Sequence, residues 1–371
     1  QNLAILKWDH DINKNFSYYV KTYYHDWWCD HSQLDLQGNF VYDDSLWGYQ
    51  DWGVNAMGSF RFGGGHEVLA GVDYQNYFGD AEDWQIMGER EQIWSLFAQY
   101  RPHLPFAPFI KSALGARYNK SDAGDKLIWN ISARGEFAGG IYVRAVAGTS
   151  YILPNGTQLY SDGEAYRGNP DLEPEESTNL DVGLGFRREL FFVEAGYFYQ
   201  EIKNLIVREP TDGDRDMYQN VDEAEVKGFD LMAGVGPFHG FSLMSSYTNQ
   251  EVIQGDTGKQ MDTVPEYFWK VILSWRHDLG SSKVGADLAG RYIGKVMAYD
   301  TDYGGYWVAD LSLFYRFGKE HQHMITVRAE NLFDEQYYTC LGRRNDTSGQ
   351  RFVYGYEGIP FNVMVGYSFY F

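Results

Sequence analysis

Aromatic and cationic side chains gather in the segments between runs of alternating residues, where they could contact a ligand. Flat aromatic faces stack on planar groups, and arginine guanidinium groups donate paired hydrogen bonds to anions. This combination suits a flat or anionic ligand. For any single aromatic, the alternative is that it packs loop against loop or belongs to a belt at a membrane surface. The expected ligand-binding residues are Trp47, Trp84, Tyr160, Tyr166, Arg167, Tyr303, Tyr337, Arg343 and Arg344, with Trp52, Tyr299 and Tyr338 in the same segments.

Candidate metal ligands are few. His25 and His31 flank Cys29, and this trio is a candidate site for a soft metal. Methionines near the expected loops are candidates for binding copper, although scattered methionines more often fill space. Acidic clusters are candidates for calcium, or for divalent ions that bridge to lipopolysaccharide. The methionines are Met87, Met217, Met261 and Met297, and the clusters span Asp43–Asp44, Asp80–Asp83, Asp122–Asp125, Glu173–Glu176 and Asp212–Asp216.

No catalytic constellation is present in the sequence. It contains no Gly-x-Ser-x-Gly elbow, no His-Glu-x-x-His motif and no phosphate-binding loop, so we expect neither an enzyme nor a cofactor. Lys and Arg number 31 against 51 Asp and Glu, and the net charge of −20 argues against nucleic acid as a partner. The chain has two cysteines, Cys29 and Cys340, which excludes a disulfide-rich scaffold and leaves a single bond between them open.

Alternation of apolar and polar residues is the clearest structural signal. Every odd position from Phe361 to Phe371 is apolar, and most even positions are smaller or more polar. A period of two indicates a strand with one apolar face and one wetter face. About 17 such segments recur, and each is long enough, at about ten residues, to cross a bilayer as a tilted strand. The chain lacks the run of roughly 18 apolar residues that a membrane-spanning helix needs.

Full charges lie at the middle of the expected polar faces. Aromatic pairs such as Trp269 with Trp275 lie at strand ends, as in the belts at the two surfaces of a membrane. We therefore expect an all-β fold, a transmembrane antiparallel β-barrel whose apolar face contacts lipid. A large soluble β-sandwich or propeller, with the apolar face inside, is the alternative. The charges are Arg61, Arg117, Arg134, Arg144, Asp181, Glu194, Asp230, Arg276, Asp287, Arg328 and Glu330.

Connections between the expected strands alternate in length. Short ones include Gly63–His66 and Gly318–Gln322, whereas long ones include Cys29–Gln50, Pro154–Glu176 and Gln336–Pro360. This alternation is typical of an outer-membrane barrel, in which long loops face outward. Closed single-chain bacterial barrels have an even number of strands. Because the expected number is odd, we expect further strands, and whatever fills the lumen, to come from a separate or missing N-terminal segment.

Two stretches are similar to signatures of one receptor family. The run Asn169, Pro170, Asp171, Leu172, Glu173, Pro174, Glu175 resembles the Asn-Pro-Asx-Leu-x-Pro-Glu box of TonB-dependent outer-membrane receptors. Upstream, Tyr151–Pro154 looks like a diverged form of the aromatic box that accompanies it. The run that starts with Asn331, Leu332 and Phe333 is similar to a signature near the end of such receptors, and Phe371 matches their aromatic carboxyl terminus.

The Asn-Pro-Asp-Leu box also has a physical interpretation. Pro170 and Pro174 fix φ and lack an amide donor, so the segment is extended and cannot become a central strand. Asn169 and Asp171 can bond their own backbone and hold a turn. We therefore expect the box to set strand register at the rim rather than to contact a ligand. Phe371 completes the apolar face of its strand, and in the family such a residue is also read by the barrel-assembly machinery.

The resemblance implies a barrel of roughly 22 strands with an N-terminal plug domain in its lumen. Residues 1–371 would be a C-terminal portion of the barrel, without the plug. The resemblance further implies the bacterial outer membrane, contact with its lipid and lipopolysaccharide, and active uptake energised by the TonB complex through the plug. A ferric siderophore is the expected cargo. Alternative cargoes are cobalamin, haem or another metal complex, and the alternative function is that of a passive porin. Haem is less favoured as cargo because residues Ile152–Asp171 contain no histidine.

Overall fold

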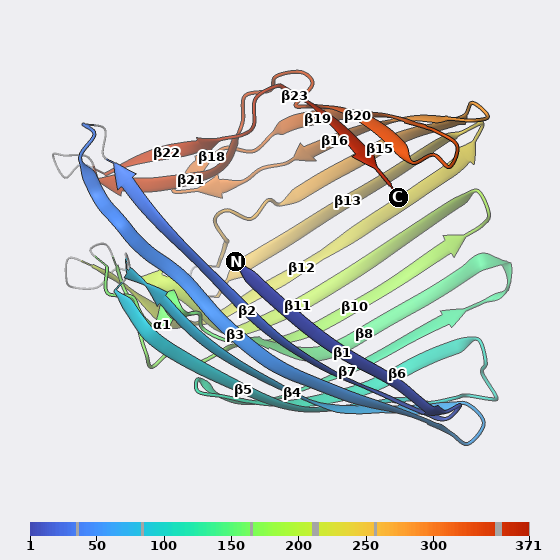
Figure 1. Cartoon of the computed structure of the whole chain (residues 1–371), viewed down its shortest axis with the longest axis horizontal. Coiled ribbons are helices and arrows are strands. Elements are labelled where there is room, and N and C mark those ends of the chain that lie inside the picture. Colours follow the sequence, from blue (N-terminus) through green and yellow to red (C-terminus); the bar gives the residue numbers. More distant parts are fainter. Residues whose placement is uncertain are drawn as a thin grey trace. The chain divides into compact units, whose positions relative to one another are not determined.

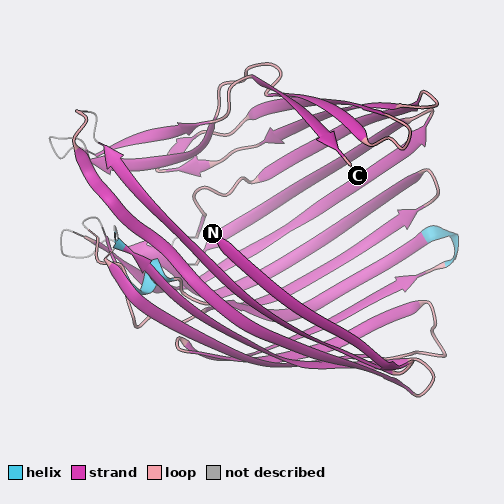
Figure 2. Ribbon diagram, in the orientation of Figure 1, coloured by secondary structure: helices cyan, strands magenta, loops and turns pink. Residues whose placement is uncertain are grey.

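Antiparallel strands make up most of the chain, and helix is almost absent (Figure 1, Figure 2). The computed structural model describes residues 1–34, 37–82, 85–163, 166–209, 215–255, 258–345 and 351–370. Within these ranges the helical elements are α1 (Gly156–Tyr160) and the 3-10 turn η2 (Ala138–Gly140). None of the helices described is long and apolar enough to cross a membrane.

Nineteen strands belong to one large sheet, and two separate ribbons have two strands each. Two of the 19, β9 and β14, are only two residues long, so the described ranges hold 17 longer strands in this sheet, the number that the alternation predicts. These are β1 (Asn2–Asn13), β2 (Phe16–Leu34), β3 (Phe40–Phe62), β4 (His66–Ala81), β5 (Ile86–Arg101), β6 (Ile110–Ser121), β7 (Gly124–Glu136), β8 (Ile141–Ile152), β10 (Glu175–Arg187), β11 (Phe191–Glu209), β12 (Asp216–Phe238), β13 (Phe241–Gln254), β15 (Tyr267–Asp278), β16 (Lys283–Ile293), β19 (Tyr306–Phe317), β20 (His323–Glu330) and β23 (Asn362–Phe369). The short strands are β9 (Tyr166–Arg167) and β14 (Lys259–Gln260), and the ribbons pair β17 (Met297–Ala298) with β18 (Thr301–Asp302) and β21 (Tyr338–Asn345) with β22 (Arg351–Glu357).

The chain divides into two compact units. Unit 1 comprises Gln1–Gly135, Ala145–Leu180 and Gln200–Ala224, and unit 2 comprises Glu136–Arg144, Asp181–Tyr199 and Glu225–Phe371. In unit 1, strands β1 to β7 pair antiparallel in the order of the sequence. In unit 2, antiparallel pairing runs through β13, β15, β16, β19, β20 and β23.

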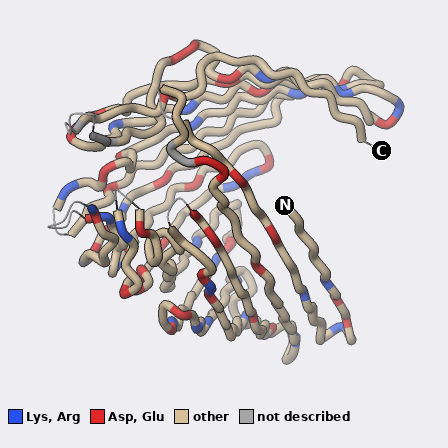
Figure 3. The backbone as a smooth tube through the Cα atoms, turned by 60° about the vertical axis from the view of Figure 1, so that its left-hand side comes forward, with Lys and Arg blue, Asp and Glu red and all other residues tan. Residues whose placement is uncertain are grey.

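In each unit the strands have one apolar face and one polar face, as the alternation predicts. On the apolar face large side chains are exposed, for example Leu273 in β15 and Val365 in β23. On the polar face, mid-strand charges pair with one another, such as Arg276 with Asp287 at 2.8 Å. Figure 3 shows that charged residues lie along the strands as well as in the connections. An apolar face of this extent needs a partner other than water. The alternative of a soluble sandwich with this face inside is therefore wrong.

Most connections alternate in length. The exception is around β6, where the connection before it (102–109) is longer than the connection after it (122–123), and some of the expected long loops are strand instead. The expected loop Cys29–Gln50 is mostly hairpin, because β2 continues to Leu34 and β3 begins at Phe40. Backbone pairing of Cys29 with Trp47 extends the β2–β3 ladder through this segment.

One set of connections follows β2, β4, β6, β8, β11, β13, β16 and β20. It holds α1, β9, β14 and the two ribbons, whereas η2 lies in the other set, between β7 and β8. We call the strand ends that carry the first of these sets the long-connection ends.

Candidate functional site

The connection between β8 and β10 forms α1 because its sequence supplies a helix start. Asn155 Oδ1 accepts a hydrogen bond from the backbone N–H of Gln158 at 2.9 Å, and Gln158 Oε1 accepts one from the backbone N–H of Asn155 at 2.9 Å. This reciprocal capping box satisfies two amide donors that a helix start would otherwise leave unpaired. Leu159 is buried and anchors the helix. The helix lies at the long-connection ends of unit 1 (Figure 1).

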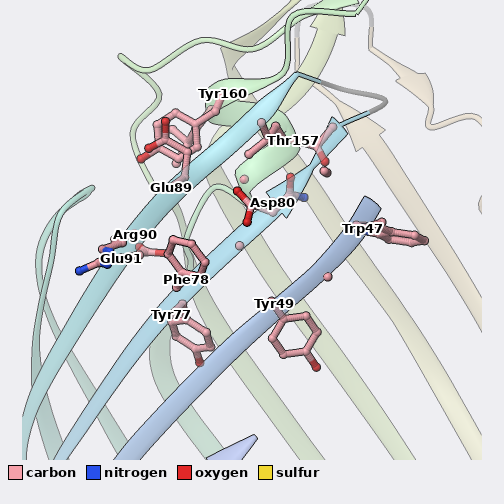
Figure 4. A pocket seen from close by; sticks show the side chains of 17 residues that line it. Trp47, Tyr49, Tyr77, Phe78, Asp80, Glu89, Arg90, Glu91, Thr157 and Tyr160 are labelled. Atoms are coloured by element: carbon pink, nitrogen blue, oxygen red, sulfur yellow. The ribbon is translucent and has the colours of Figure 1, made fainter. Parts of the chain in front are cut away.

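A cavity of about 530 Å³ is lined by α1 and by the long-connection ends of β3, β4 and β5 (Figure 4). Trp47 and Tyr49 are two residues apart on β3, so both face the same side of the strand. On β5 the same spacing places Glu89 and Glu91 on one side, and the β4–β5 register sets Glu91 opposite Tyr77. The volume lies within the range of small-molecule sites.

Negative charge dominates the cavity. The described residues that line it include three carboxylates, Asp80, Glu89 and Glu91, and one cation, Arg90. Asp80 accepts a backbone hydrogen bond, and the Arg90 guanidinium lies 5.3 Å from the centre of the Phe78 ring. Glu91 Oε1 is buried and has no hydrogen-bond partner in the described part of the chain. Oε1 of Glu91 is therefore available to accept a hydrogen bond from a bound ligand.

Tyr160 extends from α1 toward Glu89 (Figure 4). Burial raises the pKa of Tyr160 above its ordinary value of 10.0, and the negative charges of Glu89, Glu91 and Asp122 raise it further. The phenol therefore remains neutral, and able to donate a hydrogen bond, throughout the physiological pH range. The cavity thus places the Tyr160 hydroxyl together with the carboxylates of Glu89 and Glu91.

Neighbouring rings hold the aromatic wall of β3. Trp47 packs edge-on against Trp27, with ring centres 5.5 Å apart and an angle of 87° between the rings. Tyr49 packs edge-on against His25 at 5.2 Å, and His25 Nδ1 lies 3.1 Å from Asp51 Oδ1. Rings that are fixed in this way bind a ligand at a low cost in side-chain entropy. Aromatic faces beside carboxylates can bind planar groups, hydrogen-bond donors and cations.

Four of the nine expected ligand-binding residues lie in unit 1 within the described ranges. Trp47 and Tyr160 line the cavity together. Tyr166 and Arg167 form β9, which pairs with β12 and does not line the cavity. Arg208 lies 5.3 Å from the centre of the Tyr166 ring, and Arg167 Nη2 lies 3.7 Å from Met217 Sδ. Through these contacts, the side chains of Tyr166 and Arg167 pack β9 against Arg208 and Met217.

Of the other five expected residues, two belong to unit 2 and three have side chains outside the described part of the chain. Tyr303 and Tyr337 belong to unit 2, where Tyr337 stacks on Tyr306 at 4.6 Å and its hydroxyl lies 3.4 Å from Arg291 Nη2. Trp84 lies outside the described residues. Arg343 and Arg344 lie on β21, and their side chains are also outside the described part of the molecule.

The cavity residues that sequence reasoning missed include Tyr49, Tyr77, Glu89 and Glu91. The spacing of two from Trp47 was the signal for Tyr49, since both residues face one side of a strand. The position of Tyr77 opposite Glu91 depends on the register between two strands. Periodicity within one strand does not reveal that register.

The candidate metal sites are not assembled. His25 contacts Asp51, and Cys29 Sγ lies 3.6 Å from the carbonyl oxygen of Asp30. Within the described ranges, no group of three or more His, Cys, Asp and Glu side chains is arranged to hold a metal ion. The acidic clusters therefore do not form a calcium site there, and the cluster Asp212–Asp216 lies partly outside the described residues. Cys29 and Cys340 are both free thiols.

The Asn-Pro-Asp-Leu box forms a hydrogen-bonded turn against α1 and β12. Asn169 Oδ1 accepts from the Asp171 amide at 3.0 Å, while Asn169 Nδ2 donates to the Tyr218 carbonyl at 3.1 Å. The backbone N–H of Asn169 donates to the Gln158 carbonyl of α1 at 2.8 Å. Leu172 is 4 % exposed, and Pro174 is also buried. These contacts give the box an anchoring role at the long-connection end of unit 1.

The box continues into β10 through further side-chain contacts. Asn220 Oδ1 accepts from the Glu173 amide at 2.8 Å, and Asn220 Nδ2 donates to the Glu173 carbonyl at 2.9 Å. Glu175 Oε1 accepts from the Ile206 amide at 2.8 Å. Glu175 thus satisfies a backbone amide of β11, and the Asn220 side chain of β12 satisfies the backbone of Glu173.

In unit 2, the Asn-Leu-Phe-Asp segment forms the turn that follows β20. Asn331 is 1 % exposed, and its Nδ2 donates to the carbonyls of Glu335 at 2.9 Å and Ile359 at 3.0 Å. Its Oδ1 accepts from the Glu335 amide at 2.9 Å. Phe333, in contrast, is exposed. Phe371 lies outside the described residues.

The family model for the TonB dependent receptor-like β-barrel matches residues 1–332. The chain belongs to the TonB-dependent receptor family. Its large antiparallel sheet corresponds to the β-barrel domain of these outer-membrane receptors.

Curated relatives include two proteins named vitamin B12 transporter BtuB. The protein of Photobacterium profundum is 32 % identical over 115 residues, which are 30 % of this chain and 18 % of the relative. The protein of Vibrio vulnificus (strain CMCP6) is 25 % identical over 244 residues, which are 61 % of this chain and 36 % of the relative. The match therefore spans about a third or less of the length of these relatives.

Solved structures share the fold at low sequence identity. A variant of the ferric enterobactin receptor PfeA of Pseudomonas aeruginosa, in complex with enterobactin, gives a TM-score of 0.76 at 17 % identity, covering 98 % of this chain and 61 % of that one. The copper transporter OprC gives a TM-score of 0.77 at 14 % identity, covering 100 % of this chain and 65 % of that one. At these identities the similarity concerns the fold.

Proposed function

We propose that the chain is part of a receptor that takes up a ferric siderophore across the bacterial outer membrane by TonB-driven transport. The observation that carries the proposal is the cavity at the long-connection ends of β3, β4 and β5, in a chain of the TonB-dependent receptor family. In an outer-membrane barrel these ends face outward. A nutrient that arrives from outside meets the cavity first.

The cavity suits a chelate of moderate size. Its volume of about 530 Å³ accommodates one drug-sized molecule or one part of a larger one. Tyr49, Tyr77 and Trp47 offer flat apolar faces, and Tyr160 offers a neutral hydroxyl. Similarity in fold to receptors named for ferric enterobactin and ferric catecholates is consistent with a siderophore.

In this proposal residues 1–371 act as the C-terminal portion of the receptor barrel. The apolar face contacts membrane lipid, and the exposed acidic connections contact lipopolysaccharide through divalent ions. A plug domain fills the lumen and transmits force from the TonB complex. The protein performs transport and is not an enzyme.

Cobalamin is the second candidate cargo, because the curated relatives are named vitamin B12 transporters. Haem fits less well, since the described residues that line the cavity contain no histidine to bind its iron. A passive porin would need an open lumen, and purified protein in a planar bilayer would then give large, steady channels.

Growth experiments test the proposal directly. The gene is deleted, and growth is measured under iron limitation on single ferric siderophores and, in a cobalamin auxotroph, on limiting cobalamin. We expect loss of growth on one siderophore, the same loss when TonB is deleted, and restoration by the cloned gene. Loss of growth on cobalamin alone would replace the siderophore with cobalamin. Growth that does not depend on TonB would contradict the proposal.

A further inference from the structure

The cavity in unit 1 combines aromatic rings with uncompensated carboxylates, and this combination indicates the charge of the ligand. Glu89 and Glu91 project from the same side of β5, and Glu91 Oε1 is buried without a hydrogen-bond partner among the described residues. A buried carboxylate oxygen that lacks a donor is costly. A ligand that brings a cation or a hydrogen-bond donor removes this cost.

The lining cation Arg90 and two arginines of the connection segments beside α1 have contacts of their own. Arg90, the one Lys or Arg among the described lining residues, lies over the Phe78 ring at 5.3 Å. Arg167, on the adjoining β9, contacts Met217, and Arg215 Nη1 pairs with Asp162 at 2.6 Å. An anionic chelate would therefore place its charge beside Glu89 and Glu91 with little compensation.

The aromatic rings favour a cation in the same place. Tyr49, Tyr77 and Trp47 line the same cavity as the two glutamates, and Tyr77 lies opposite Glu91 on the neighbouring strand (Figure 4). The negative face of an aromatic ring attracts an ammonium group, and the attraction strengthens as the group loses water. Rings and carboxylates together form a site for an organic cation with a flat or apolar body.

We infer that this cavity selects a ferric chelate that carries a protonated amine, with Glu89 and Glu91 facing the amine. The inference rests on the proposed function and narrows its substrate class. It departs from the expectation of a flat or anionic ligand, because the one arginine among the described lining residues, Arg90, is not among the expected ligand-binding residues.

Two chelates that differ only in charge test the inference. Ferrioxamine B carries a free protonated amine, and its N-acetyl derivative has the same ferric centre without the charge. Binding of both, labelled with radioactive iron, is measured by equilibrium dialysis with the full receptor in detergent. We expect the amine form to bind about tenfold more tightly, which corresponds to about 1.4 kcal/mol.

Matched variants separate the two glutamates from the overall charge. In Glu89→Gln/Glu91→Gln the preference for the amine should fall to about one, through weaker binding of the amine form. Glu189→Gln/Glu320→Gln removes two exposed carboxylates from short connections and should keep the preference. The single variant Glu89→Gln, with a partial loss of preference, serves if the double variant does not fold.

Equal affinity of the wild-type receptor for both chelates would overturn the inference, as would binding of neither chelate or an unchanged preference in the double variant. None of these results touches the uptake proposal, which depends on TonB-dependent growth. Conversely, the receptor could prefer the amine form and support no growth on any siderophore. The inferred charge selectivity would then stand, and the proposal of a ferric siderophore as cargo would be wrong.

Discussion

At the scale of single residues, Asn331 shows how a sequence motif can be structural. Its side chain makes three hydrogen bonds to backbone groups of Glu335 and Ile359 while almost fully buried. Its φ of 48° lies in the left-handed region, which asparagine tolerates better than most residues. One side chain therefore ties the turn after β20 to the segment before β23.

Replacing Asn331 with alanine should destabilise the protein strongly. The Asn331→Ala variant leaves one amide and two carbonyls of a buried turn unpaired, and we expect a loss of about 3 kcal/mol in the free energy of unfolding. Denaturant titration of the detergent-solubilised protein, followed by circular dichroism, measures it. The neighbouring Phe333→Ala at an exposed site is the control and should change stability by less than about 1 kcal/mol. Equal effects of the two variants would contradict the role of Asn331.

Tyr160 gives the second residue-scale prediction, which concerns pH. Burial and nearby carboxylates raise the pKa of Tyr160 in the folded protein above 10.0, the value expected when unfolded. The contribution of Tyr160 to stability is therefore complete below pH 10 and declines as the pH rises from there through the folded-state pKa. Thermal unfolding between about pH 9 and 12 should show a smaller decline in Tyr160→Phe than in wild type. The same decline in both proteins would count against this assignment.

At the scale of elements, α1 and β9 pack tightly together because the backbone at Gly168, directly after β9, lies very close to the backbone of α1. The backbone N–H of Gly168 donates to the Ser161 carbonyl at 2.7 Å. A Cβ atom at position 168 would lie 2.6 Å from the carbonyl carbon of Leu159. Glycine at position 168 therefore lets the Asn-Pro-Asp-Leu box dock on the helix that carries Tyr160.

Gly168→Ala should separate α1 from the box. We expect a loss of about 1–3 kcal/mol from overpacking, faster tryptic cleavage at Arg167, and weaker ligand binding because Tyr160 moves with α1. Gly156→Ala is the matched control, since a Cβ there meets nothing within 4 Å. Proteolysis and binding are measured side by side on the two variants. Unchanged cleavage in Gly168→Ala would show that the close approach is not needed.

Elements were easier to predict than the contacts between them. The alternation that ends at Phe317 predicts β19 (Tyr306–Phe317), and the one from Phe361 predicts β23 (Asn362–Phe369), because alternation is a property of one strand. Only a small part of the cavity was predicted. Trp47 and Tyr160 stood out by residue type, but the partnership of Tyr77 with Glu91 arises from register between strands. The length of the β2–β3 hairpin was missed because its aromatic and acidic residues look like a loop.

At the scale of the whole molecule, the strands expose more large apolar side chains than a water-soluble protein does. Many large apolar side chains of the strands are exposed, whereas the buried apolar residues found among the described ones are few and mostly small. The driving force for this fold therefore cannot come from a central core alone. Transfer of the apolar face into hydrocarbon supplies it, and the polar face keeps its ion pairs.

Adjacent residues on β19 offer a direct test of this division. Leu313 is 43 % exposed on the apolar face, and Ser312 lies on the polar face opposite Asp287 and Arg328. Leu313→Arg places a charge in hydrocarbon and should cost about 2–4 kcal/mol if the residue lies near the midplane. Ser312→Arg adds the same charge beside Asp287, next to a cavity of about 500 Å³, and should cost much less. Folding into lipid vesicles from urea, followed by tryptophan fluorescence, compares the two. A larger loss in Ser312→Arg would mean that the faces are assigned the wrong way round, and the membrane orientation of every strand in unit 2 would reverse with it.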